Sequence, residues 1–132
     1  MHPRLSEEWQ DLLSLYPGTI HAESPERIEL TLKLSPGIYN SAETRITVLI
    51  PVGYRATGPD GFLVPSDLRL QAGAMPASDA SSLGMPGWLM MSFHFMDAAG
   101  ATTWKPTADP KRGDNLTGYI EAVKAFLAAG CN

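Results

Sequence analysis

The chain has 132 residues, of which 44% are hydrophobic, and a formal net charge of −4. This size and composition are typical of a single domain that buries a core without a disulfide or metal, and they exclude a disordered chain. The positive charges are scattered and no run approaches the about 20 apolar residues of a membrane span, so neither nucleic acid nor a membrane is expected as a partner.

The two ends of the chain carry little information. Cys131 is the only cysteine, and one cysteine can form neither an internal disulfide nor a zinc site by itself. We therefore expect a cytoplasmic protein with a reduced thiol, and the first ten residues lack the apolar stretch of a signal peptide. The prediction is one domain over residues 1–132, with frayed tails at 1–4 and 130–132.

The first predicted elements are a helix and a strand. Residues 6–15 form an amphipathic pattern, with Ser6 as a suitable N-cap. Its apolar side chains fall largely on one face: Trp9, Leu12, Leu13 and Leu15. Residues 27–34 alternate strictly between polar and apolar side chains, which is typical of a half-buried antiparallel strand.

Three more strands are predicted further along. Residues 44–50 alternate like the first strand, and part of residues 62–70 predicts a short strand with Pro65 at a kink or edge. Residues 88–96 are nearly apolar throughout and predict a central fourth strand. The stretch 72–87 before it is rich in small residues and too long for a simple turn.

The last predicted element is a helix that begins at an N-cap, Asp114, and runs to about Ala129, before Gly130. The order helix, four strands, helix indicates an α+β fold, with helices packed on a four-stranded antiparallel meander.

This order, together with two motifs, resembles the core of the ubiquitin-conjugating (UBC) enzymes. Pro51, Tyr54 and the turn at Gly58 stand where that family has an F-P-x-x-Y-P turn, although Arg55 replaces the proline after the tyrosine. Residues 104–106, Trp-Lys-Pro, resemble the family's W-x-P motif. The resemblance covers roughly residues 5–129 and does not extend to the family's two C-terminal helices.

More specifically, the chain resembles the diverged bacterial branch of that superfamily, through S-F-H-F-M-D, then W-x-P, then R-G-D-N-L-x-x-Y-I. Members of that branch are associated with ubiquitin-like proteins, activating enzymes and deconjugating peptidases. The resemblance implies an activating enzyme and a ubiquitin-like protein as partners. It also implies that the first helix contacts the activating enzyme. The binding residues implied are Trp9, Leu12, Tyr54, Trp104, Arg112 and Asp114.

The family's central chemistry is missing from this sequence. A conjugating enzyme carries its cargo as a thioester on a cysteine, because a thiolate is a strong nucleophile. That cysteine lies shortly before W-x-P in the family, whereas residues 94–103 contain none, and the family's H-P-N segment is also unmatched. A standard thioester relay is therefore not expected. Cys131 as a relocated acceptor is a less favoured interpretation than a frayed terminal residue.

His94 is the candidate catalytic residue, since it lies where the family does its chemistry and Asp97 is close by. It could act as a general base or orient an acyl group. If strand alternation continues, Ser92 shares a face with His94, and an oxyester on Ser92 could replace the thioester. The alternative is a hydrogen-bonded histidine within a sheet.

No cofactor is predicted. His2, His21 and His94 lack the spacing of metal ligands, so a zinc site is not expected. The glycines at positions 53, 58 and 61 lack the G-K-[ST] sequence and the following helix of a phosphate-binding loop.

Three functions remain open. The first is a cysteine-less UBC-like component that positions a ubiquitin-like protein for transfer, assisted by His94 and Asp97. The second is a non-catalytic adaptor on the same fold. The third, a small hydrolase using Ser92, His94 and Asp97, is least favoured because these residues are too close on one strand to fold back on each other. Exposure of Trp9, and a cleft open to His94, would favour the first function.

Overall fold

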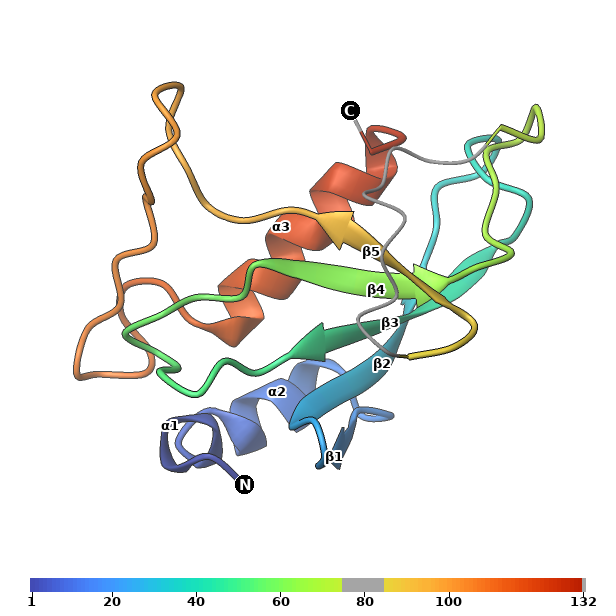
Figure 1. Ribbon diagram of the computed structural model, residues 1–132. Coiled ribbons are helices and arrows are strands. Elements are labelled where there is room, and N and C mark those ends of the chain that lie inside the picture. The colour runs from blue at the N-terminus through green and yellow to red at the C-terminus, as the bar shows by residue number, and fades with distance from the viewer. Residues whose placement is uncertain (75–84, 132) are drawn as a thin grey trace.

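The computed structural model describes residues 1–74 and 85–131, which form a five-stranded antiparallel sheet and three helices (Figure 1). Most of the predicted loop at 72–87, and Asn132 of the predicted tail, lie outside these residues. The strand order is β1-β2-β3-β4-β5, so each strand pairs with its neighbour in sequence. The bounds are α1 (Pro3–Ser6), α2 (Trp9–Leu15), β1 (Ile20–Ala22), β2 (Arg27–Lys33), β3 (Glu43–Leu49), β4 (Gly61–Pro65), β5 (Trp88–Ser92) and α3 (Leu116–Ala128).

The α+β class is confirmed, but the predicted number of four strands is wrong. The additional strand, β1, pairs with β2 in the register Ile20↔Glu29 to Ala22↔Arg27. Three residues are too few to show an alternating pattern, so the sequence gives no strand signal there. The predicted central position of the apolar strand is also wrong, because β5 lies at one edge of the described sheet and β3 lies in its middle.

The alternation predicted for the two long strands is confirmed. β2 and β3 pair over their full length, from Arg27↔Leu49 to Lys33↔Glu43. Their inward side chains are buried against α3, which lies across one face of the sheet (Figure 1). The core contains Ile28, Leu30, Leu32, Ile46, Val48, Phe62, Val64, Met91, Leu116, Tyr119, Ile120, Val123 and Leu127.

The predicted helix over residues 6–15 is two short helices, and Ser6 does not cap the second. Ser6 is the last residue of α1, where its hydroxyl donates to the carbonyl of His2. α2 begins after Glu8, which stands at the N-cap position without a side-chain capping bond. The Glu8 carboxylate instead points into the core, and the chain breaks between the two helices where this side chain turns inward.

Residues near both ends of the described chain contact other parts of the fold. The Met1 amine pairs with Glu23 at 3.2 Å, and the His2 amide donates to Glu26 at 2.8 Å. At the other end, Cys131 is 3% exposed and its Sγ lies 3.3 Å from the Tyr39 hydroxyl. Burial raises the pKa of this thiol, which makes it a poor nucleophile and a poor candidate for a relocated acceptor.

Among the described residues, no helix is both long enough and apolar enough to cross a bilayer.

A buried polar network joins the N-terminal helices to the rest of the fold. The Glu8 carboxylate, 3% exposed, accepts from the Tyr54 hydroxyl at 2.7 Å and from Arg55 Nε at 3.1 Å. Its other oxygen accepts from the backbone N–H of Leu116, at the start of α3, at 2.7 Å. Three segments that are distant in sequence therefore meet at one carboxylate.

The Arg55 guanidinium makes further contacts within this network. Its Nη2 donates to the Arg4 carbonyl at 2.9 Å and to Glu7 at 3.1 Å. Burial alone would lower the pKa of Arg55, but its hydrogen bonds to Glu8 and Glu7 outweigh burial and raise it. Burial, reinforced by the charge of Glu8, raises the pKa of Tyr54. The buried arginine is therefore charged and depends on its carboxylate partners.

Replacing Glu8 by Gln is expected to lower the free energy of unfolding by about 3 kcal/mol, because it leaves the buried Arg55 charge without its buried partner. Urea unfolding followed by far-UV circular dichroism measures the loss. The control is Arg112→Gln, which removes an ion pair between Arg112 and Asp109. Because the Arg112 side chain is 83% exposed, this change should alter the free energy of unfolding by under about 0.5 kcal/mol. Equal effects of the two variants would show that the buried pair does not hold the fold.

Candidate functional site

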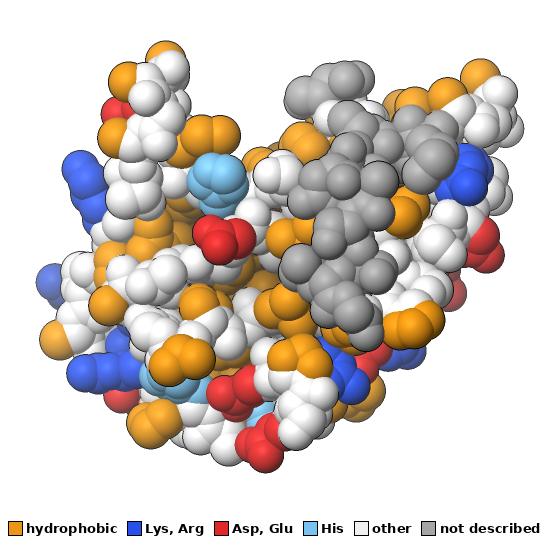
Figure 2. Space-filling model, in the orientation of Figure 1, with side chains coloured by type: hydrophobic (Ala, Val, Ile, Leu, Met, Phe, Trp, Pro, Cys, Tyr) orange, Lys and Arg blue, Asp and Glu red, His pale blue; other side chains and the backbone are white. Residues whose placement is uncertain are grey.

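A cleft of about 250 Å³ lies between the segment that leads into β4 and the segment that follows β5. Residues 93–104 leave the sheet as a long loop that projects from the molecule (Figures 1 and 2). The surface around the base of this loop is mostly hydrophobic or uncharged (Figure 2). The cleft is lined by Ala56, Thr57, Gly58, Pro59, Asp60, His94, Phe95, Thr102 and Trp104.

Trp104 forms one wall of the cleft and connects the two motifs that carry the family resemblance. Its indole N–H donates to the Arg55 carbonyl at 2.7 Å, and its ring lies 6.4 Å from the Tyr54 ring. A Cβ built on Gly58 would be 2.4 Å from the Trp104 ring, so the close approach of the loop to the indole requires glycine. The W-x-P tryptophan therefore packs on the predicted Tyr54 turn, about fifty residues earlier in sequence.

Arg55 takes an unusual backbone conformation at this point. Its φ is +32°, in the left-handed region that a residue with a Cβ adopts only at some cost. The side-chain bonds to Glu8 and the carbonyl bond from Trp104 hold it there. Arg55, which replaces a proline of the family motif, thus directs its carbonyl toward the indole of Trp104.

His94 is half-buried and lines the cleft, as the catalytic hypothesis requires, but it does not form a triad with Ser92 and Asp97. Among the described residues, no hydrogen bond or ion pair joins His94 to either of them. Ser92 is exposed at the end of β5. The Asp97 carboxylate accepts from the backbone N–H groups of Ala99 and Ala101 at 2.9 and 3.0 Å. It therefore stabilises the tip of the loop and does not orient His94 as a general base.

The expected alternation of side chains from Ser92 to Met96 ends because β5 ends at Ser92. Phe93 turns into the core, where its ring stacks on Phe126 with 4.7 Å between centroids. Its carbonyl accepts from the Tyr119 hydroxyl at 2.7 Å instead of from a neighbouring strand. Burying the Phe93 ring against α3 stabilises the fold more than continued strand pairing would.

Asp114 does not cap the last helix as predicted. The N-cap of α3 is Asn115, whose side chain accepts from the Gly118 amide at 2.8 Å. Asp114 instead accepts from the backbone N–H of Lys105 at 2.7 Å and so closes the loop between W-x-P and α3. Arg112 is exposed and pairs only weakly with Asp109 in the same turn, at 3.7 Å. Neither residue lines the cleft.

The side chains expected to form a contact surface on the first helix differ in their exposure. Trp9 is half-buried, with its ring edge against His21 at 6.1 Å between centroids. Leu12 is fully buried and unavailable to a partner. Leu15, which we placed on the same apolar face, is 58% exposed.

Sequence reasoning missed the two charged residues that hold the site, Glu8 and Arg55. One signal was present, since Leu5, Glu8 and Leu12 follow the i, i+3, i+7 spacing of one helix face. The two leucines are fully buried, so a carboxylate between them must also turn inward. Sequence reasoning also missed Asp60, which lines the cleft together with His94.

Replacing Gly58 by Ala is expected to displace the Trp104 ring, because no real Cβ lies 2.4 Å from a ring carbon. We expect a loss of about 1–3 kcal/mol in unfolding free energy, the usual cost of overpacking, with a change in tryptophan emission. Urea unfolding monitored by fluorescence measures both. Gly18→Ala is the matched control, since a Cβ at that position would meet nothing within 4 Å. If the two variants behave alike, the indole does not pack tightly on this loop.

Known protein families, curated proteins and solved structures were compared with this chain, and none matches. The resemblance to the UBC family therefore rests on the order of the elements and on the two motifs that meet at Trp104.

Proposed function

We propose that this protein is a cysteine-less UBC-like component of a bacterial ubiquitin-like protein modification pathway. It binds an activating enzyme and a ubiquitin-like protein and positions the latter for transfer without a cysteine thioester. The observation that supports this most is the packing of Trp104 on the turn at Tyr54 and Gly58. Trp104 of the second motif lines the cleft and packs on Tyr54 of the first, so the two motifs are in contact and are not unrelated surface features.

The location of the only thiol supports transfer without a thioester. Cys131 lies just beyond the C-terminal end of α3, whereas the Trp104–Arg55–Glu8 contacts lie at its N-terminal end. Thirteen helical residues separate these ends, a rise of about 20 Å. A buried thiol at that distance cannot take part in chemistry at the cleft.

The cleft is better suited to binding than to nucleophilic catalysis. His94 offers one imidazole and Asp60 one carboxylate at its edge, and both can hydrogen-bond to an extended peptide. A serine nucleophile would need a base within hydrogen-bond reach, and the Ser92 hydroxyl has no such bond to His94 among the described residues. The hydrolase hypothesis is therefore not carried further.

A non-catalytic adaptor on the same fold is the second candidate. The lack of a hydrogen bond between His94 and Asp97 among the described residues favours it, because His94 then has no carboxylate to orient it as a base. The two candidates share the same partners and differ only in whether cargo is transferred.

The exposed part of α2 is the proposed contact for the activating enzyme. Leu15 is 58% exposed and Trp9 is half-buried there, and aromatic and large apolar side chains provide much of the affinity at interfaces. Leu12 has no part in this contact because it is buried.

The pathway is tested by mixing the protein with an activating enzyme and ubiquitin-like protein from the same source and with ATP. We expect a complex in size-exclusion chromatography and no thiol-sensitive adduct by intact mass, with Cys131→Ala indistinguishable from the unmodified chain. An adduct that is cleaved by hydroxylamine, resists reducing agent and disappears in Ser92→Ala would assign cargo transfer through an oxyester. A thiol-sensitive adduct lost in Cys131→Ala, or no complex at all, would reject the proposal.

The contact surface is tested by Leu15→Asp, which should weaken binding to the activating enzyme by about tenfold or more, because it places a charge within an apolar contact. Binding is measured by isothermal titration calorimetry. The matched control is Val52→Asp, which adds the same charge at a side chain that is 96% exposed in the segment between β3 and β4 and should leave the affinity unchanged. Equal losses would place the interface elsewhere.

A further inference from the structure

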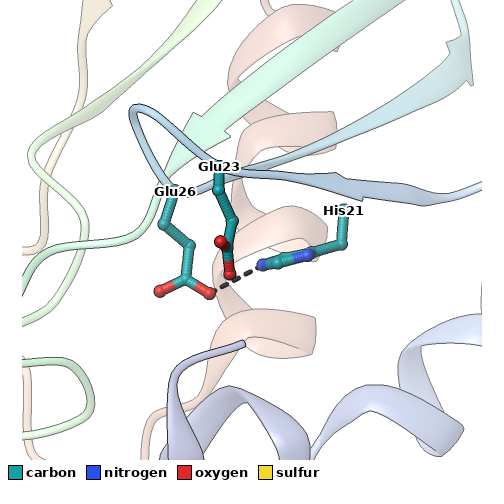
Figure 3. Close-up of side chains that lie close together, drawn as sticks. All are labelled: His21, Glu23 and Glu26. Atoms are coloured by element: carbon teal, nitrogen blue, oxygen red, sulfur yellow. Dashed lines mark hydrogen bonds and ion pairs between the residues drawn. The ribbon is translucent and has the colours of Figure 1, made fainter.

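Away from the cleft, three side chains of the hairpin between β1 and β2 bring metal-ligating atoms together. Figure 3 shows His21, Glu23 and Glu26 pointing toward one another from this hairpin. One ligand atom from each lies within 4.8 Å of the other two. The set combines one imidazole with two carboxylates.

The hairpin geometry explains why these residues meet. His21 pairs with Ile28 and Ala22 pairs with Arg27, so residues 23–26 form the connecting loop. The loop returns Glu26 to the side of His21, where its Oε2 lies 2.7 Å from the imidazole Nε2. Ligands that are five residues apart in sequence are therefore adjacent without any ion being required to form the turn.

The loop is held by contacts that leave the carboxylates accessible. Arg27 Nη1 donates to the backbone carbonyls of Glu23 and Pro25 at 3.2 and 3.0 Å, so it fixes the backbone and does not pair with either ligand carboxylate. The edge of the Trp9 ring packs against the imidazole of His21. These contacts hold the loop backbone and the His21 ring in place.

The two carboxylates already attract positive groups. The Met1 amine lies 3.2 Å from Glu23, and the His2 amide and His21 both contact Glu26 Oε2. These contacts hold the acidic side chains at partly exposed positions, where the His21, Glu23 and Glu26 side chains are 15%, 64% and 22% accessible to solvent. A divalent ion could enter from solvent and replace the amine and the imidazole–carboxylate contact.

We propose that His21, Glu23 and Glu26 bind a divalent ion of the zinc class, with a fourth position left to water. Imidazole favours zinc and similar transition metals, whereas calcium and magnesium prefer oxygen ligands alone. Zinc ligands at about 2.0–2.2 Å in a tetrahedron lie about 3.4 Å from each other. The His21–Glu26 pair must open by under about 1 Å, and the exposed Glu23 side chain must rotate inward.

The site connects the hairpin to the N-terminal segment, since His2 and Trp9 contact two of the three ligands. An ion bound only by the folded state raises stability by mass action. The protein would therefore gain thermal stability in the presence of zinc, independently of whether it acts in ubiquitin-like protein transfer.

The site is tested on the full chain, with any affinity tag removed and metals stripped with a chelator. Titration calorimetry with ZnCl₂ should show one ion per chain and a raised melting temperature, and Co²⁺ should give the visible absorption of a tetrahedral site. Ca²⁺ should give neither. His21→Gln and Glu23→Gln should each weaken zinc binding by more than about tenfold, since even loss of a residue that only supports a ligand costs that much.

Two controls make the result decisive. Glu23 is 64% exposed, so Glu23→Gln should retain the native circular dichroism spectrum and separate loss of the ligand from loss of the fold. His94→Ala removes a half-buried histidine elsewhere and should leave zinc binding unchanged. No zinc binding below millimolar concentration, binding that survives both hairpin variants, or binding lost in His94→Ala would each overturn the proposal.

Discussion

The buried carboxylate of Glu8 is held at once by the Tyr54 hydroxyl, the Arg55 guanidinium and the first amide of α3. Two buried charges are stabilising only where their hydrogen bonds are satisfied, and here each oxygen of the carboxylate is used. Arg55, fixed by this contact, presents its carbonyl to the indole of Trp104. The placement of Trp104 in the cleft wall therefore depends on a carboxylate that does not line the cleft.

The parts of the fold that follow a local pattern were predictable, and those set by distant contacts were not. The alternation in β2 and β3 identified both strands and their half-buried character, since each pattern is many residues long. β1 has too few residues to carry a pattern. The end of β5 was missed because Phe93 leaves the sheet for a ring in α3, and sequence periodicity contains no information about such a partner.

The candidate site was predictable in its location but not in its chemistry. His94 and Trp104 do line one cleft, as the motif order indicated. The proximity of Ser92 and Asp97 in sequence suggested a reaction, yet the Asp97 carboxylate is consumed by backbone amides that only the folded loop brings to it. The same distinction applies to His21, Glu23 and Glu26, which a hairpin with a weak sequence signal brings together. Spacing within a sequence identifies ligands on one helix or strand and overlooks those that a turn assembles.

The antiparallel meander also determines the order in which the chain can assemble. Each strand pairs with the next one in sequence, so the sheet can grow hairpin by hairpin, with little chain entropy lost at each step. The bond from Leu116 to Glu8 instead joins residues 108 positions apart and can form only when the Tyr54 turn and α3 are both in place. This long-range contact therefore forms after the local hairpins. Opening of the N-terminal segment would expose Arg55 and loosen the wall of the cleft while the sheet remains intact.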